Sequence, residues 1–168
     1  FIPTLNEAPT IAELIGEFKE RGFRHILVMD GHSTDGTPDI ARAAGAVVRT
    51  QTGRGKGNAI IEAVAIIDKP YVLMLDGDGT YAPDDVERML DPLGLGFDHV
   101  IGDRLAGPEG EAFTRLNLLG NQILNLMFKL AHGRDLHDIL SGYRAFTLSS
   151  IRQMTLKESG FEIETEMA

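Results

Sequence analysis

Short apolar segments alternate with helical segments along the whole chain of 168 residues, and this alternation constrains the fold more than any other feature. After the first apolar segment, Ile11, Leu14, Ile15 and Phe18 recur at helical spacing. Parallel strands need a crossover connection, which is usually a helix. We therefore predict an α/β fold with a single open, mostly parallel sheet and helices on both faces. The predicted strands cover residues 1–2, 25–29, 46–48, 71–75 and 97–101.

Capping residues place the ends of the predicted helices. Asn6 stands where the N-cap of the first helix is expected, and Thr37 with Pro38 begins the second. Gly22 and Gly45 follow the last turns of these two helices, where a left-handed residue often ends a helix. On this basis the helices begin near residues 6, 37, 58 and 83.

The composition is that of one soluble globular domain, with 43% apolar and 24% charged residues. Sixteen basic residues against 25 acidic ones leave a net charge of -9, which argues against a nucleic-acid partner. The chain has no cysteine, so disulfides, thiolate metal sites and cysteine nucleophiles are excluded. The longest stretch without a charged residue, 116–128, is too short and too rich in Asn and Gln to span a bilayer.

Polar side chains and glycines gather directly after each predicted strand. In an open α/β sheet the ligand crevice lies outside the carboxyl ends of the strands, so clusters that are distant in sequence meet at one site. Turn formation would explain any single cluster, but five at equivalent positions indicate a binding site. The clusters are Asn6 and Glu7; Asp30, Ser33 and Asp35; 53–56; Asp76 and Asp78; and Asp103 and Arg104.

The most specific of these clusters is Asp76-Gly77-Asp78, which follows an apolar strand. It presents two carboxylates separated by a glycine that allows the backbone to turn. Such hard oxygen ligands suit Mg²⁺ or Mn²⁺, with diphosphate oxygens and water in the remaining positions. The alternative is an Asx turn that caps the strand without binding a metal.

Four segments carry motifs in a fixed order: 3–7 (PTLNE), 29–37 (MDGHSTDGT), 53–59 (GRGKGNA) and 76–78 (DGD). With them the chain resembles family 2 glycosyltransferases of the GT-A fold over nearly its whole length. Within that family it is most similar to the dolichyl-phosphate mannose and polyprenyl-phosphate glucose synthases. Three later segments carry this closer resemblance: Gly102-Asp103-Arg104, Asp138 with Ser141-Gly142-Tyr143-Arg144, and Phe161-Glu162-Ile163-Glu164. We expect one glycosyltransferase domain over 1–168, trimmed at both ends.

The resemblance implies that the chain binds a nucleotide sugar, a UDP- or GDP-hexose. Carboxylates such as Asp30 would accept hydrogen bonds from ring N–H groups and ribose hydroxyls. The family often has two adjacent acids where this chain has Asp30-Gly31, which leaves the contacts of base and ribose open. Glu7 could instead complement the N-terminal dipole of the first helix. The implied nucleotide-sugar-binding residues are Pro3, Leu5, Glu7, Asp30, Ser33, Lys56, Asp76 and Gly77.

The turn Gly55-Lys56-Gly57 at a helix start resembles a phosphate cradle, which would offer backbone N–H groups and a cation to an anion. It is not a Walker loop, because Gly57 follows Lys56 where that loop has Ser or Thr. The alternative is a lysine in solvent beside the helix entry.

The reaction that the resemblance implies is the inverting, metal-dependent transfer of a hexose to a polyprenyl (dolichyl) phosphate. The metal at Asp76 and Asp78 would neutralise the departing diphosphate. A phosphate acceptor needs cations but no general base, whereas a hydroxyl on a saccharide or metabolite would use Asp138 as the base. Asp138 could also be a structural partner of Arg144. The expected catalytic residues are Asp78, Arg104 and Asp138, and the expected acceptor-phosphate residues are Arg104, Arg115, Ser141 and Arg144.

Residues 116–130 form a largely apolar predicted helix with a narrow stripe of asparagines. One interpretation buries this helix under the sheet or in an oligomer interface. The other is a peripheral membrane contact that receives the polyprenyl chain at the cytoplasmic face. A non-catalytic module of receiver type is a further alternative for the whole chain. It predicts adjacent acids after the first strand, where this chain has Asn6-Glu7.

Overall fold

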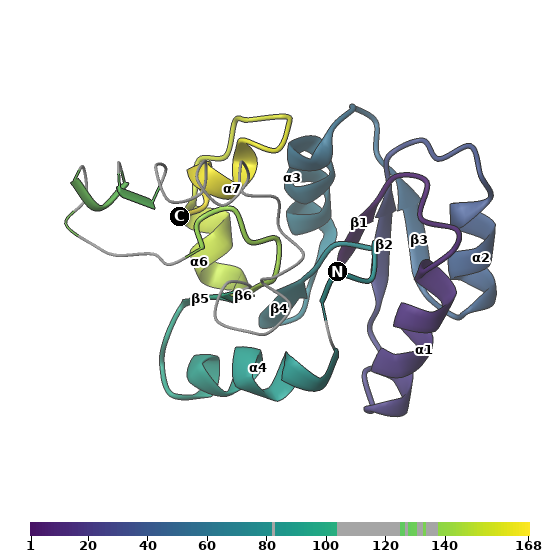
Figure 1. The fold of residues 1–168 in the computed structure, drawn as a ribbon, viewed down its shortest axis with the longest axis horizontal. Helices are drawn as coiled ribbons and strands as arrows, with labels where there is room; N and C mark the ends of the chain where they lie inside the picture. The colour runs from purple at the N-terminus through teal and green to yellow at the C-terminus, as the bar shows by residue number, and fades with distance from the viewer. Residues whose placement is uncertain (82, 104–124, 127, 131–132, 134–137) are drawn as a thin grey trace.

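The structure, a computed structural model, describes residues 1–81, 83–103, 125–126, 128–130, 133 and 138–168 (Figure 1). Strands and helices alternate from β1 to β5, as the apolar pattern predicts. The strands are β1 (Ile2–Thr4), β2 (Leu27–Asp30), β3 (Val47–Thr50), β4 (Tyr71–Met74), β5 (His99–Ile101) and β6 (Arg144–Thr147). The helices are α1 (Ile11–Glu20), α2 (Thr37–Ala43), α3 (Lys56–Ile66), the 3₁₀ turn η1 (Pro83–Asp85), α4 (Val86–Gly94), α6 (Leu148–Gln153) and α7 (Ile163–Glu166).

Two groups of three strands make up the described sheet. In the first group β1 and β3 flank β2, and all three are parallel, with Val28 opposite Ile2. In the second group β4 and β5 flank β6, which runs antiparallel to both. Phe1 joins the groups, because its amino group donates to the Leu73 carbonyl and its own carbonyl accepts from the Leu75 N–H at 3.3 Å. The α/β fold with a mostly parallel sheet is therefore confirmed.

Helices cover both faces of this sheet, as predicted, and each face has its own apolar core. Figure 1 shows α3 and α6 on one side of the strands and α1 and α4 on the other. The first face buries Met74 and Phe146 under α3 and α6, and the second buries Val28 and Leu75 under α1, α2 and α4. Met74 and Leu75 are adjacent in sequence but enter opposite cores, because successive side chains of a strand alternate.

Helix starts differ from the prediction at two places. α1 begins at Ile11 after Thr10, so Asn6 is not its N-cap. Asn6 has a left-handed backbone with φ 60°, and its side-chain oxygen accepts the N–H of Thr34. α3 begins at Lys56, two residues earlier than expected. Asn6 therefore connects two loops. The sequence alone does not distinguish this role from that of an N-cap, because an asparagine side chain can bond backbone groups in either place.

Strand β6 was not predicted from the sequence. Its residues Arg144–Thr147 begin and end with polar side chains, yet Arg144, Ala145 and Phe146 are all fully buried. Alternation of polar and apolar residues is the usual signal for a strand, and a buried arginine removes that signal.

No helix among the described residues is long and apolar enough to cross a membrane. Most of segment 116–130 lies outside the described residues, so the buried helix and the membrane contact both remain predictions for it.

Candidate active site

The loops that follow β1 and β2 are joined by side chains that bond backbone groups across the gap. Asp35 accepts from the N–H of Ala8 at 3.0 Å and from the hydroxyl of Thr37 at 2.6 Å. The Thr37 hydroxyl in turn accepts from the N–H of Glu7 at 2.9 Å. Ser33 accepts from the N–H of Asn6 at 2.8 Å. The first two predicted clusters thus form one unit, and in this structure Ser33 and Asp35 hold its loops together.

Asp30 is the buried member of this unit, with only 2% of its surface exposed. Its carboxylate accepts from the N–H groups of His32 at 3.1 Å and Ser33 at 3.2 Å. The next residue, Gly31, donates its N–H to the carbonyl of Thr4 at 2.7 Å, and a Cβ there would lie 3.1 Å from that oxygen. We call this unit, consisting of Asn6, Asp30, Ser33, Asp35 and Thr37, the Asp30 cluster.

The Asp76-Gly77-Asp78 turn packs directly against the loop after β1. The carbonyl of Gly77 accepts from the Thr10 hydroxyl at 2.5 Å, and a Cβ on Gly77 would come within 2.9 Å of the Thr4 methyl group. Burial, followed by the negative charges of Asp78, Asp76 and Asp35, raises the pKa of Glu7. The fold therefore gathers acidic side chains from the first and fourth clusters at one edge of the sheet.

These carboxylates fit a divalent cation that is shared with a phosphate ligand. Among the described residues no three carboxylates or imidazoles are placed to enclose a metal by themselves. Asp76 is partly exposed, and Asp78 is exposed with one oxygen accepting the N–H of Thr80 at 2.9 Å. Mg²⁺ is usually held by one or two carboxylates together with substrate phosphates, and Mn²⁺ takes the same oxygen ligands. The donor set therefore suits such an ion.

Lys56 has partners other than those predicted. Its ammonium group lies 2.5 Å from a carboxylate oxygen of Asp76 and 2.5 Å from one of Glu164, and only 7% of its side chain is exposed. Burial lowers the pKa of Lys56, but the charges of both carboxylates outweigh burial and raise it above its usual value. We call Lys56, Asp76 and Glu164 the Lys56 cluster. Lys56 is therefore not a lysine in solvent, and its role toward a phosphate stays a prediction.

The glycines beside Lys56 also serve a purpose other than the predicted one. A Cβ on Gly55 would lie 2.2 Å from the carbonyl oxygen of Ser159, and one on Gly57 would lie 2.0 Å from that of Glu158. The N–H of Gly57 donates to the Ser159 carbonyl at 2.9 Å. Glycine is needed here because segment 158–160 approaches the turn closely, and that segment takes the N–H expected to bind phosphate.

Arg144 was expected to bind an acceptor phosphate, but the structure buries its side chain completely. Its guanidinium donates to the carbonyls of Ser141 at 2.9 Å, Ile139 at 2.7 Å and Glu164 at 2.7 Å. Arg144 therefore connects β6, the preceding loop and the segment that carries Glu164. This placement differs from the prediction because backbone carbonyls, like phosphate oxygens, accept hydrogen bonds from a guanidinium.

Two other predicted residues lie in the same loop. Ser141 is fully buried, and its hydroxyl accepts the N–H of Tyr143 at 3.2 Å. Asp138 is 2% exposed. In the same loop, Gly142 lies so close to Asp76 that a Cβ would approach its carboxylate to 2.3 Å. The loop thus adjoins the acidic turn.

Some predicted residues lie outside the described residues: Arg104 and Arg115, with most of the helix predicted at 116–130. Sequence reasoning assigned no role to Glu164, which pairs with Lys56, or to Tyr81, whose hydroxyl accepts the N–H of Gly142 at 2.8 Å. The motif Phe161–Glu164 was the available signal for Glu164.

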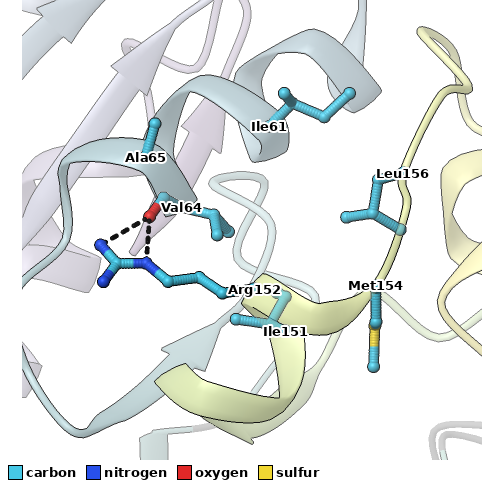
Figure 2. A pocket seen from close by; sticks show the side chains of 7 residues that line it. All are labelled: Ile61, Val64, Ala65, Ile151, Arg152, Met154 and Leu156. Atoms are coloured by element: carbon cyan, nitrogen blue, oxygen red, sulfur yellow. Dashed lines mark hydrogen bonds between the residues drawn. The ribbon is translucent and has the colours of Figure 1, made fainter.

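A separate apolar hollow of about 180 Å³ lies between α3 and α6. Figure 2 shows Arg152 at its edge, donating to the carbonyl of Val64 at 3.3–3.4 Å. None of the residues that line it belongs to the five predicted clusters. They are Ile61, Val64, Ala65, Ile151, Arg152, Met154 and Leu156.

The geometry brings strand-end loops together around paired carboxylates, and comparison with known proteins agrees with it. The sequence model for "Glycosyl transferase family 2" matches residues 1–158. The chain belongs to this family. It is 58% identical to glycosyltransferase AglJ of Haloferax volcanii, over 99% of this chain and 55% of that protein. It is 34% identical to a dolichyl-phosphate hexose transferase of the same organism, over 85% of this chain and 63% of that protein.

Among solved structures, the glucosyl-3-phosphoglycerate synthase of Mycobacterium tuberculosis superimposes with a TM-score of 0.80 and 25% identity, over 99% of this chain and 62% of that one. A further structure of that synthase holds Mn²⁺ and UDP-glucose. The chain spans about half the length of AglJ and somewhat less than two thirds of the other two proteins.

Proposed function

We propose that this chain binds the donor in a metal-dependent, inverting glycosyltransferase that moves a hexose from a UDP- or GDP-sugar to a polyprenyl phosphate. One observation carries the proposal. The Asp76-Gly77-Asp78 turn packs against the loop after β1, so that Glu7, Asp76 and Asp78 meet beside the Asp30 cluster. This edge is the carboxyl end of the parallel strands, where open α/β sheets bind their ligands.

The two clusters match the two ends of a nucleotide diphosphate. Asp30 is held at the end of β2 by backbone N–H groups, which leaves carboxylate lone pairs for a ring N–H or a ribose hydroxyl. Asp76 and Asp78 would hold Mg²⁺ or Mn²⁺ against the diphosphate. When bound, the metal would supply charge neutralisation for the departing nucleoside diphosphate. The mycobacterial synthase holds Mn²⁺ and UDP-glucose, which supports this choice of ligands.

The choice of acceptor rests on chemistry and on the relatives. A phosphate monoester is already anionic at neutral pH, so it can attack the sugar without a general base. Asp138 remains the candidate base for a hydroxyl acceptor. The name of the dolichyl-phosphate hexose transferase favours the phosphate acceptor. Arg104 and Arg115 remain the predicted ligands of the acceptor phosphate.

Calorimetry of the chain with UDP and with GDP tests the donor site, with Mn²⁺ in one arm and EDTA in the other. We expect one nucleotide to bind in Mn²⁺, with binding greatly weakened by EDTA and by Asp76→Ala. If a folded chain binds neither nucleotide, the proposal is wrong. Transfer assays with dolichyl phosphate and with a free saccharide then separate the two acceptor classes.

A further inference from the structure

Contacts from several segments of the chain fix the position of Glu164. Its backbone carbonyl accepts from buried Arg144, and its carboxylate faces Lys56 at 2.5 Å with 8% of the side chain exposed. Upstream, the Ser159 carbonyl accepts the N–H of Gly57, which ties the same segment to the turn that carries Lys56. The location of this carboxylate is therefore specified by contacts at both ends of segment 158–164.

The Lys56 cluster is costly to bury, so stability alone is a weak reason for it. Removing a lysine and a carboxylate from water costs several kcal/mol per ion, and replacing such groups by apolar side chains is often neutral or stabilising. The ring of Phe161 adds a cation–π contact at 5.7 Å from the Lys56 ammonium, although that ring is 72% exposed. Because the cluster includes Asp76, a candidate metal ligand, its charges point to a role in the proposed metal site.

The balance of charge indicates what that role is. Lys56 restrains the Asp76 carboxylate, but its positive charge would also repel a cation bound there. With Glu164 present the three groups carry a net charge of -1, from one positive and two negative side chains. Without Glu164 the net charge would be zero, and Asp76 would attract a divalent cation less strongly. At this spacing the interactions are too short-range for salt to screen well.

We infer that Glu164 is a positioning residue that offsets the charge of Lys56, so that Lys56 can orient Asp76 without weakening the metal site. This inference rests on the proposed function, since it concerns the same site. It assigns to the motif Phe161–Glu164 a contribution to metal affinity that is exerted through Lys56 and without contact to the ion.

The test measures how much Mn²⁺ improves UDP binding, by calorimetry of UDP in Mn²⁺ and in EDTA at one pH, or of GDP if that is the nucleotide bound. Glu164→Gln keeps the shape and removes the charge. We expect the metal-dependent gain in affinity to fall about tenfold, which corresponds to about 1.4 kcal/mol. Nucleotide affinity in EDTA should not fall, because the uncompensated Lys56 still attracts a diphosphate. If Glu164 had only a structural role, the variant would weaken nucleotide binding both in Mn²⁺ and in EDTA.

The double variant Lys56→Met/Glu164→Gln removes both opposite charges, and we expect it to recover the gain to within about threefold of the unmodified chain. Glu87→Gln on the exposed surface of α4 is the matched control for loss of one negative charge, and it should change nothing. If Glu164→Gln does not fold, the double variant decides the question, because a loss of more than about tenfold in the folded double variant contradicts the inference.

The outcomes separate this inference from the proposed function. An unmodified, folded chain that binds neither nucleotide overturns the proposed function. An unmodified chain that binds nucleotide with Mn²⁺, together with a Glu164→Gln variant that shows the same metal-dependent gain, overturns only the role of Glu164.

Discussion

The Asp30 cluster and the Lys56 cluster lie at the same edge of the sheet but are held in different ways. In the Asp30 cluster, side-chain oxygens accept backbone N–H groups across two loops. In the Lys56 cluster, a buried lysine bridges two carboxylates from α7 and from the end of β4. Hydrogen bonds to backbone groups fix the conformation of the loops whether or not a ligand is bound. In a cluster of charged side chains, by contrast, the energy of each group changes when a charged ligand binds beside it. Under the proposed function, the Asp30 cluster would hold the nucleoside and the Lys56 cluster would adjoin the metal diphosphate.

The strongest test of this contrast removes Asp78, a proposed metal ligand. We expect Asp78→Ala to lower Mn²⁺-dependent nucleotide affinity by about a hundredfold, or about 2.7 kcal/mol, because an exposed carboxylate beside the diphosphate is lost. The free energy of unfolding should change by less than about 0.5 kcal/mol, since Asp78 lies on the surface. Calorimetry and thermal melting measure the two effects. A large drop in Tm without loss of binding would contradict the assignment.

Removing the central residue of the Asp30 cluster should lower stability, which Asp78→Ala leaves nearly unchanged. In Asp30→Ala the N–H groups of His32 and Ser33 lose their acceptor, and we expect the free energy of unfolding to fall by about 1–3 kcal/mol. Urea denaturation measures this loss. Adding Mn²⁺ without nucleotide should not recover it. If Mn²⁺ alone restored the stability, the metal site would stabilise the Asp30 cluster, and the two clusters would not be independent.

A smaller effect is expected from Glu7, whose titration depends on its burial and on the acidic side chains Asp78 and Asp76. Its pKa is raised above 4.5 in the folded chain, so the folded state binds this proton more tightly than the unfolded state. The resulting stability is present below pH 4.5 and is lost as the pH rises through the raised pKa. We expect Glu7→Gln to melt higher than the unmodified chain at pH 7 in EDTA and about equally at pH 4. Mn²⁺ with nucleotide should narrow the difference at pH 7.

Asp35 gives the smallest expected effect and belongs to the other cluster. The hydrogen bond from the Thr37 hydroxyl, with others from backbone N–H groups, lowers the pKa of Asp35 below 3.8. Stability from this group is therefore present above pH 3.8 and is lost as the pH falls through the lowered pKa. Asp35→Asn should reduce Tm slightly at pH 7, and the difference should vanish in strong acid. If the difference in Tm were the same at all pH values, the effect would come from altered hydrogen-bond geometry and not from the charge of Asp35.

Most of the fold could be predicted because its signals are local. Periodic apolar residues and glycine stops located β1 to β5 and the helices between them to within a few residues. The topology rule for open sheets then placed the polar clusters at one edge, and the contacts of Glu7 with the acidic turn and of Lys56 with Asp76 agree with it. β6 was missed because a fully buried arginine obscures the alternation of that strand.

The partners of individual side chains could not be obtained in the same way. Residue type and spacing specify that Lys56 carries a positive charge beside a close turn, but the choice between solvent, phosphate and carboxylate depends on segment 158–164, which is a hundred residues away in sequence. Arg144 likewise donates hydrogen bonds to carbonyls that only folding brings near. Local pattern reflects backbone preference and burial, which act over a few residues. Pairing of charges and donors depends on distances across the whole fold, and these arise only when the sheet and its two layers of helices have assembled.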